Sequence, residues 1–116
     1  MATIKSYSDL KQSKVLSKIL SDDSADMWYW HFPTAPTYNN YGYPMFHKGE
    51  DITNIPCWSL SALLNILPEL QGSKPIITLD DNYITYPHMS GLHTKADNPV
   101  DACAEIIIKL HELKML

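Results

Sequence analysis

The sequence predicts an α+β fold, in which a small antiparallel sheet of three or four strands packs against about three helices. Three observations support this fold class: a helical apolar stripe near the carboxyl end, a leucine-rich helix between Ser59 and Pro68, and two short apolar runs that flank the polar triplet 80–82. The length of 116 residues fits a single globular domain, residues 1–116, with its own core.

The amino-terminal third predicts one helix and one strand. Residues 9–20 have helical period, with Ser8 as the expected N-cap. The expected apolar stripe of this helix consists of Val15, Leu16, Ile19 and Leu20. The aromatic run 27–32 predicts a strand, because large aromatic side chains pack well on a pleated surface. Alternation along the strand groups Trp28, Trp30 and Phe32 on one side, which we expect to face the core.

Residues 33–54 show no sustained period and predict a long ordered loop, with a short strand at 43–47. The loop combines tyrosine with asparagine and glycine, a mixture that binding loops also use. Two interpretations remain open for Tyr38, Tyr41 and Tyr43. Either these tyrosines pack the loop onto the sheet, or they form a surface that binds a partner.

The central helix is predicted between Ser59, which caps its first turn, and Pro68. Its expected core face follows the spacing i, i+3, i+4 and i+7 and consists of Leu60, Leu63, Leu64 and Leu67. Further along, residues 76–79 and 83–86 predict a hairpin in which Asn82 adopts the left-handed conformation. We expect the following segment, 87–97, to be a loop.

The closing helix has the clearest start signal in the chain. Asn98 suits the cap, Pro99 suits the first helical position, and Asp101 suits the positive end of the helix dipole. Its expected apolar stripe consists of Val100, Cys103, Ile106, Ile107, Leu110 and Leu113. We expect this helix to pack against the same sheet as the central helix.

Charge and hydropathy exclude two classes of partner. All nine basic residues are lysines, the net charge is -4 and the pI is about 5.6. The absence of arginine and the acidic balance argue against nucleic-acid recognition, because guanidinium groups make the commonest specific contacts to guanine. No apolar run approaches the roughly 18 residues that span a bilayer, so no membrane partner is expected.

The two cysteines, Cys57 and Cys103, lie in apolar stretches, where free cysteine behaves as a small buried hydrophobe. The amino terminus lacks the apolar region of a signal peptide. These observations predict a cytoplasmic protein with reduced thiols, and a disulfide between the two cysteines is the less favoured alternative.

Motifs of catalysis and metal binding are not recognisable in the sequence. His88 and His93 are five residues apart, without an accompanying HExxH, CxxC or cysteine-histidine cluster. No GxSxG, P-loop or Rossmann motif is present. The sequence therefore favours a non-enzymatic protein without a metal or cofactor, although an enzymatic activity remains an alternative.

Four segments carry a resemblance to a family, and they occur in the order QSKVLSKIL, SADMWYW, IPCWSLSALLNILP and NPVDACAEIIIKLHEL. In combination, the chain resembles a family of small uncharacterised proteins from gut Bacteroidales genomes and their phages and mobile elements. The resemblance spans most of the chain and implies a phage or mobile-element accessory protein. It implies no particular activity.

Two hypotheses for function follow from the aromatic residues. The first is an interaction protein that binds an unidentified partner protein through an aromatic loop, with the expected contact residues Trp30, His31, Tyr38, Tyr41 and Tyr43. The second is a small-ligand binder or hydrolase with a pocket between the sheet and the loop, lined by Trp28, Trp30, His31 and His47. The chain is expected to be a monomer or a homodimer, and pairing of the first strand with a second copy requires that strand to lie at a sheet edge.

Overall fold

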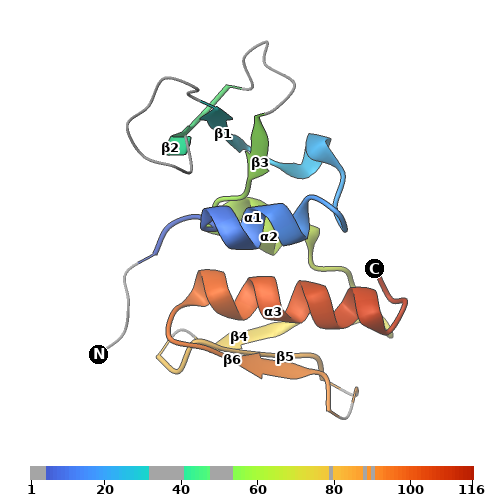
Figure 1. Ribbon diagram of the computed structural model, residues 1–116. Helices are drawn as coiled ribbons and strands as arrows, with labels where there is room; N and C mark the ends of the chain where they lie inside the picture. Colours follow the sequence, from blue (N-terminus) through green and yellow to red (C-terminus); the bar gives the residue numbers. More distant parts are fainter. Residues whose placement is uncertain (1–4, 32–40, 48–53, 79, 88, 90) are drawn as a thin grey trace.

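The computed structural model describes the whole chain except residues 1–4, 32–40, 48–53, 79, 88 and 90 (Figure 1). The described part contains three α-helices and two three-stranded antiparallel sheets. The predicted α+β class is therefore confirmed. The strands are divided between two sheets, with the helices between them, and do not form one sheet.

The first sheet contains β1 (Met27–His31), β2 (Tyr41–Met45) and β3 (Ile55–Cys57), in the order β2-β1-β3. The expected aromatic strand thus exists, and the short strand expected at 43–47 begins two residues earlier. β1 is the central strand, antiparallel to both neighbours. Both of its sides are occupied, so β1 itself does not offer an edge to a second copy of the chain.

The second sheet contains β4 (Ile76–Thr78), β5 (Tyr83–Thr85) and β6 (His93–Lys95), in the order β4-β5-β6. The predicted hairpin is confirmed as the pair β4 and β5, and Asn82 in its turn has a φ of 50°. β6 lies in the segment expected to be a loop. Three residues are too few to show an alternating pattern, so this strand depends on its pairing with β5.

The three helices are α1 (Leu10–Leu16), α2 (Leu60–Ile66) and α3 (Pro99–Glu112). Figure 1 shows a layered arrangement in which α1 and α2 lie between the first sheet and α3, while α3 covers the second sheet. The closing helix therefore packs against the second sheet and against α2. No helix in the described residues has the length and apolar character needed to cross a membrane.

The cap of α1 differs from the expected one. The Asp9 side chain accepts from the Gln12 amide at 2.8 Å, and the Gln12 side chain accepts from the Asp9 amide at 3.0 Å, which is a complete capping box. Ser8 is fully buried, and its hydroxyl contacts Ser13 and the Trp58 amide. The helix is also shorter than expected, and Val15 of its predicted stripe is exposed.

The cap of α2 is confirmed, because the Ser59 hydroxyl accepts from the Ala62 amide at 3.1 Å. The predicted leucine face is only partly correct. Leu63 is completely buried and Leu67 nearly so, whereas Leu64 is 36% exposed. A two-turn helix that packs mainly on α3 buries a narrow stripe, and here this stripe runs through Ala62 and Leu63.

The closing helix begins as predicted, since the Asn98 side chain accepts from the Asp101 amide at 2.9 Å and Pro99 is the first helical residue. Most of the predicted stripe is buried, together with two alanines: Val100, Ala102, Cys103, Ala104, Ile106, Ile107 and Leu110. Leu113 is exposed, because the helix ends at Glu112 and the chain turns away.

The predicted core side of β1 is only partly correct: Trp28 packs against the larger hydrophobic cluster, but the buried residues lie on the other side of the strand. Met27 and Tyr29 are buried, whereas Trp28 and Trp30 are only partly buried. Phe32 lies outside the described residues. Alternation defines two sides of a strand equally well, and the side that becomes buried is the one that α1 and the preceding residues cover.

The interior consists of two hydrophobic clusters. We call the first the main core, and its largest buried members are Leu16, Trp58, Leu63, Ile84, Tyr86, Ile106, Ile107 and Leu110. The second, which we call the small core, consists of Met27, Tyr29 and Cys57, with Tyr7, Leu10 and Ile55 packed against it. Cys57 and Trp58 are consecutive in the chain but belong to different clusters, so the end of β3 separates the two cores.

Candidate functional site

The predicted partner-binding residues are described to different extents. Tyr38 lies outside the described residues. Tyr41 and Tyr43 belong to β2, and His31 is the last residue of β1, but only the backbone of these three residues is described. Pairing brings His31 opposite Tyr41. Trp30 is the one predicted contact residue whose side chain is described, and it is partly buried.

Two contacts with His47, the residue after Phe46, hold the Trp30 side chain. Its indole nitrogen, Nε1, donates a hydrogen bond of 2.8 Å to the carbonyl oxygen of His47. The Trp30 and His47 rings are also in edge-to-face contact, with centroids 5.0 Å apart and planes at 84°. These two contacts give the Trp30 ring a defined orientation at the end of the sheet.

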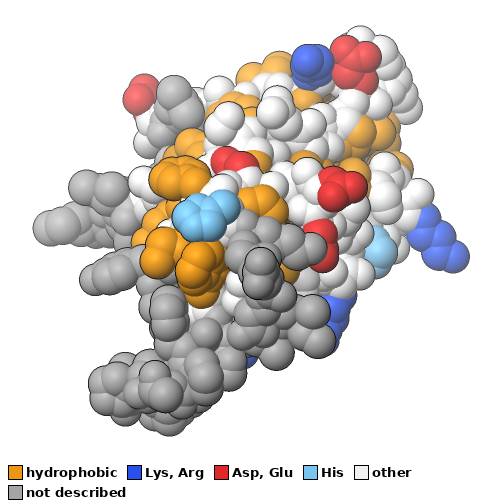
Figure 2. Space-filling view, turned by 90° about the horizontal axis from the view of Figure 1, so that it is seen from above, with side chains coloured by type: hydrophobic (Ala, Val, Ile, Leu, Met, Phe, Trp, Pro, Cys, Tyr) orange, Lys and Arg blue, Asp and Glu red, His pale blue; other side chains and the backbone are white. Residues whose placement is uncertain are grey.

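Phe46 lies beside this pair in sequence and is 78% exposed. We define the aromatic surface as Trp30, Phe46 and His47. Viewed from the end of the molecule that carries the first sheet, hydrophobic side chains gather around a histidine, next to residues that are not described (Figure 2). Aromatic side chains are among the residue types that contribute most to binding when a partner buries them.

The backbone next to this surface is irregular. In the β1 and β2 pair, Tyr29 lies opposite Pro44 and His31 lies opposite Tyr41, so β2 has one more residue than β1 between these positions. Such a bulge bends the strand and changes the direction of its side chains, and bulges are frequent next to functional sites. β2 is also an edge strand of its sheet.

The sequence did not identify Phe46 as a contact residue. The segment around it predicted a short strand, but alternation does not tell whether a side chain faces a core or solvent. Its exposure depends on its position just after an edge strand. The only available signal in the sequence was a large apolar residue in a segment that does not have apolar residues on both sides of the strand.

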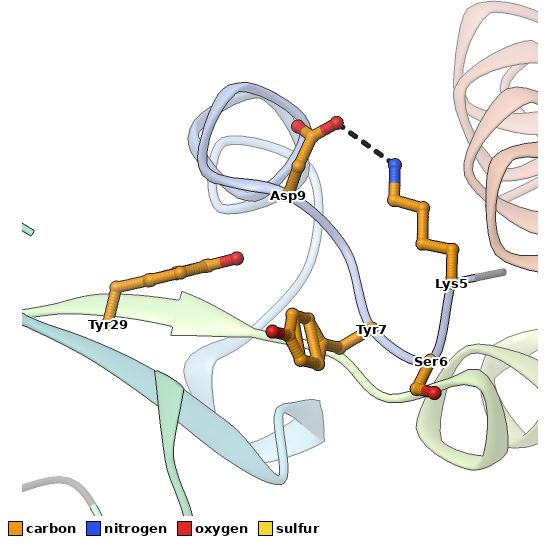
Figure 3. A pocket seen from close by; sticks show the side chains of 5 residues that line it. All are labelled: Lys5, Ser6, Tyr7, Asp9 and Tyr29. Atoms are coloured by element: carbon orange, nitrogen blue, oxygen red, sulfur yellow. Dashed lines mark hydrogen bonds and ion pairs between the residues drawn. The ribbon is translucent and has the colours of Figure 1, made fainter. Parts of the chain in front are cut away.

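A cavity of about 320 Å³ lies elsewhere, between the first sheet and the residues that precede α1. It is lined by Lys5, Ser6, Tyr7, Asp9 and Tyr29. Figure 3 shows Tyr7 and Tyr29 pointing toward each other across this space, with Asp9 and Lys5 at its rim. Of the residues expected to line a pocket, Trp28, Trp30 and His47 do not line this cavity, and the side chain of His31 lies outside the described part of the structure.

One wall of the cavity is a segment that we call the N-terminal strap, Lys5 to Ser8. The strap is joined to the junction of β3 and α2 by backbone hydrogen bonds, from the Ser8 amide to the Trp58 carbonyl at 2.8 Å and from the Leu60 amide to the Ser6 carbonyl at 3.1 Å. The Ser8 hydroxyl accepts a third bond, from the Trp58 amide, at 3.1 Å. The strap thus forms an isolated antiparallel bridge, Tyr7 opposite Ser59, with the residues that follow β3.

Lys5 fastens the strap to two helices. Its ammonium group donates to Asp9 at 2.9 Å, to Gln12 at 2.8 Å and to Asp101 at 2.6 Å. Burial disfavours the charge on Lys5, but the hydrogen bonds to Asp101 and Asp9 outweigh it and raise the Lys5 pKa. For Asp101, burial likewise disfavours the charge, while hydrogen bonds from Lys5, Gln12 and Asn98 lower its pKa.

The shift of Asp101 predicts an acid-sensitive contribution to stability. A carboxyl group with a lowered pKa in the folded state stabilises that state above its unfolded pKa, near 3.8, and loses this contribution as the pH falls through the folded pKa. Asp101→Asn is expected to lower the free energy of unfolding by about 1 kcal/mol at neutral pH. The difference from the wild type should shrink toward about pH 3, as measured by urea unfolding at both pH values.

The matched control is Asp81→Asn, which changes an exposed carboxylate in the turn between β4 and β5. This variant should unfold like the wild type at both pH values. An Asp101→Asn difference of equal size at neutral and acidic pH would show that the charge of Asp101 is not responsible.

The cysteine thiols are buried and free of disulfides. The Cys57 thiol donates to the Ser8 carbonyl at 3.3 Å and accepts from the Ser8 hydroxyl at 3.6 Å. Burial raises the Cys57 pKa against the opposing effect of hydrogen bonds from Ser8 and Ser13, and burial raises the pKa of Cys103 to about 12. Both thiols are therefore poor nucleophiles, because the thiolate is the reactive form.

Outside the masked positions, the structure contains no group of three or more histidine, cysteine, aspartate or glutamate side chains with the geometry to hold a metal ion. Comparisons with protein-family models, curated proteins and solved structures gave no match to this chain.

Proposed function

We propose that this protein is a non-enzymatic accessory protein of a phage or mobile element that binds a partner protein through the aromatic surface. The exposed Phe46 carries the proposal, since a phenylalanine side chain that is 78% exposed gains free energy when a partner removes it from water. The contact residues expected from the sequence, Tyr38, Tyr41, Tyr43 and His31, are included in the proposed contact area. The resemblance to the Bacteroidales family supports the context, a cytoplasmic protein of a host cell that carries the element.

The fixed conformation of the Trp30 and His47 side chains supports a binding role for the aromatic surface. A binding surface with fixed side chains loses less conformational entropy on association than a mobile one. Trp30 already has its indole nitrogen bonded to His47 and its ring in contact with the His47 ring. Phe46 directly precedes His47 in the chain, and a complementary apolar pocket on the partner would bury its ring.

The chemistry of the buried groups supports a non-enzymatic role. The Lys5 ammonium group forms ion pairs with Asp9 and with Asp101, and these contacts join the strap to the start of α1 and to α3. The two thiols have raised pKa values, which is the reverse of the change that activates a cysteine nucleophile. These groups have structural roles that account for their positions.

The test is a quantitative pull-down from a native host, with wild-type protein and the Phe46→Ala variant as baits. Loss of one central aromatic anchor typically weakens an interface by about 2 kcal/mol or more, roughly a thirtyfold change in affinity. Proteins captured specifically by the wild type should therefore be strongly depleted with Phe46→Ala. A triple variant of Tyr38, Tyr41 and Tyr43 to alanine tests the extended contact area in the same way.

The matched control is Ile76→Ala, which removes a large exposed apolar side chain from β4, in the other sheet. This variant should capture the same proteins as the wild type. If Phe46→Ala and the tyrosine variant also capture an unchanged set, the aromatic surface is not the binding site. Circular dichroism of each bait establishes that the variants are folded.

A further inference from the structure

We propose that the N-terminal strap is a conformational gate, which detaches from the small core while the main core remains folded. Its opening gives access to the buried side chains of Cys57 and Tyr29. The proposal does not depend on the aromatic surface. It is carried by the composition of the strap, by the space under it and by the separation of the two cores.

The strap is attached mainly through polar contacts. Of its four residues, Lys5, Ser6 and Ser8 are polar, and only Tyr7 packs an apolar ring against the small core. Lys5 is held by Asp9, Gln12 and Asp101, and Ser8 by hydrogen bonds to Trp58. Segments with few buried apolar contacts open with a smaller free energy than the surrounding fold.

The space beneath the strap supports the same conclusion. The cavity of about 320 Å³ separates strap residues Lys5, Ser6 and Tyr7 from Tyr29 of β1 (Figure 3). This space is partly open to solvent, so the strap residues that line it bury less surface than residues at native packing density. Detachment sacrifices comparatively little packing.

The small core is the part that the strap covers. Cys57 is fully buried, and the hydroxyl and carbonyl groups of Ser8 both contact its sulfur. The Tyr29 hydroxyl donates to the same Ser8 carbonyl at 2.8 Å. Movement of Ser8 away from β3 therefore uncovers Cys57 and breaks the Tyr29 bond. Cys103 belongs to the main core on α3, which contains no strap residue.

The two buried cysteines make the gate measurable. The protein is incubated with the thiol reagent DTNB in increasing, sub-denaturing concentrations of guanidinium chloride, and peptide mass spectrometry quantifies the adduct at each cysteine. A buried thiol reacts only from an open state, so its rate reports the population of that state. Cys57 should react at least about tenfold faster than Cys103, with a weaker dependence on denaturant, because gate opening exposes less surface than global unfolding.

Lys5→Met tests the fastening directly, because it keeps the aliphatic stem and removes the ammonium group. The Cys57 rate should rise about tenfold, as expected for the loss of charge-assisted hydrogen bonds, and clearly more than the Cys103 rate, which reports only the smaller effect of the lost Lys5–Asp101 contact on global stability. The matched control is Lys74→Met, at an exposed lysine before β4, and it should change neither rate.

Equal rates with equal denaturant dependence for the two cysteines of the wild type would overturn the gate, since both thiols would then be exposed only by global unfolding. So would the absence of any reaction below the global unfolding transition. An equal acceleration of both cysteines by Lys5→Met would show that Lys5 stabilises the whole fold and does not fasten a separate gate. The wild-type comparison stands even if Lys5→Met does not fold.

Discussion

Replacement of Trp58 by alanine is expected to lower the free energy of unfolding by about 3–5 kcal/mol, the largest loss of any single substitution considered for this chain. Trp58 is completely buried and is the largest of the fully buried side chains. Its indole nitrogen donates to the Ser24 hydroxyl at 3.0 Å. Truncation removes apolar contacts, leaves a cavity between α2 and its neighbours, and breaks this bond. Since domains are stable by about 5–15 kcal/mol, the variant should be close to unfolding at 37 °C.

Urea unfolding followed by far-UV circular dichroism measures this loss. The control is Leu113→Ala, at a residue after α3 that is 52% exposed, and it should change the free energy of unfolding by less than about 0.5 kcal/mol. A Trp58→Ala variant that loses less than about 1 kcal/mol would contradict the central position of this side chain in the main core.

Leu63→Ala is expected to cost about 2–5 kcal/mol, whereas Leu64→Ala should cost less than about 1 kcal/mol. Both substitutions remove the same side chain from α2 and change helix propensity equally, so the difference between the two losses reports the difference in burial. Leu63 is completely buried in the main core, and Leu64 is 36% exposed. The pair therefore measures the orientation of α2 on α3.

The free energies of unfolding of the two variants should be measured in one urea series. The error of extrapolation to zero urea is then common to both and largely cancels in their difference. Equal losses for Leu63→Ala and Leu64→Ala would mean that α2 buries the broad leucine face that its spacing predicts. A larger loss for Leu64→Ala would mean that the helix is rotated about its axis relative to α3.

Local signals in the sequence predicted the elements whose ends are fixed by nearby residues. The start of α3 follows from Asn98 and Pro99. The Asn98 side chain accepts from an amide of the first turn, and the fixed φ of Pro99 suits the first helical position, so neither needs a distant residue. The hairpin of β4 and β5 follows from the same kind of signal, because Asn82 takes a left-handed conformation that few residues tolerate. Residues within three or four positions of one another determine these helix ends and turns.

Choices between chemically equivalent alternatives could not be predicted. Ser8 and Asp9 are both good N-caps, and Asp9 became the cap because the Ser8 hydroxyl is occupied by Ser13 and Trp58. Similarly, both sides of β1 are aromatic, and the side of Met27 and Tyr29 is buried because α1 and the strap cover it. The deciding neighbour in each case lies far away in sequence.

The sequence predicted the kind of residue in the candidate site, which is aromatic, but only some of its positions. The aromatic segment around β1 and β2 was expected to carry a binding surface, and it contains Trp30. Phe46 was not expected, because alternation in the sequence does not tell whether a side chain faces a core or solvent. The strap was not expected either, since its residues show no period and Lys5 reaches Asp101 across 96 positions of the chain.

The sequence by itself determined the α+β class, the caps of α2 and α3, the hairpin and the burial of both cysteines, because capping groups, turn residues and apolar period act over short distances. Only the tertiary structure decided that the strands form two sheets, that β1 is central, that Leu64 faces outward, and that Phe46 is exposed. Each of these depends on which distant segment packs on a given side. A local pattern defines the sides of a helix or strand but not the neighbour that each side meets.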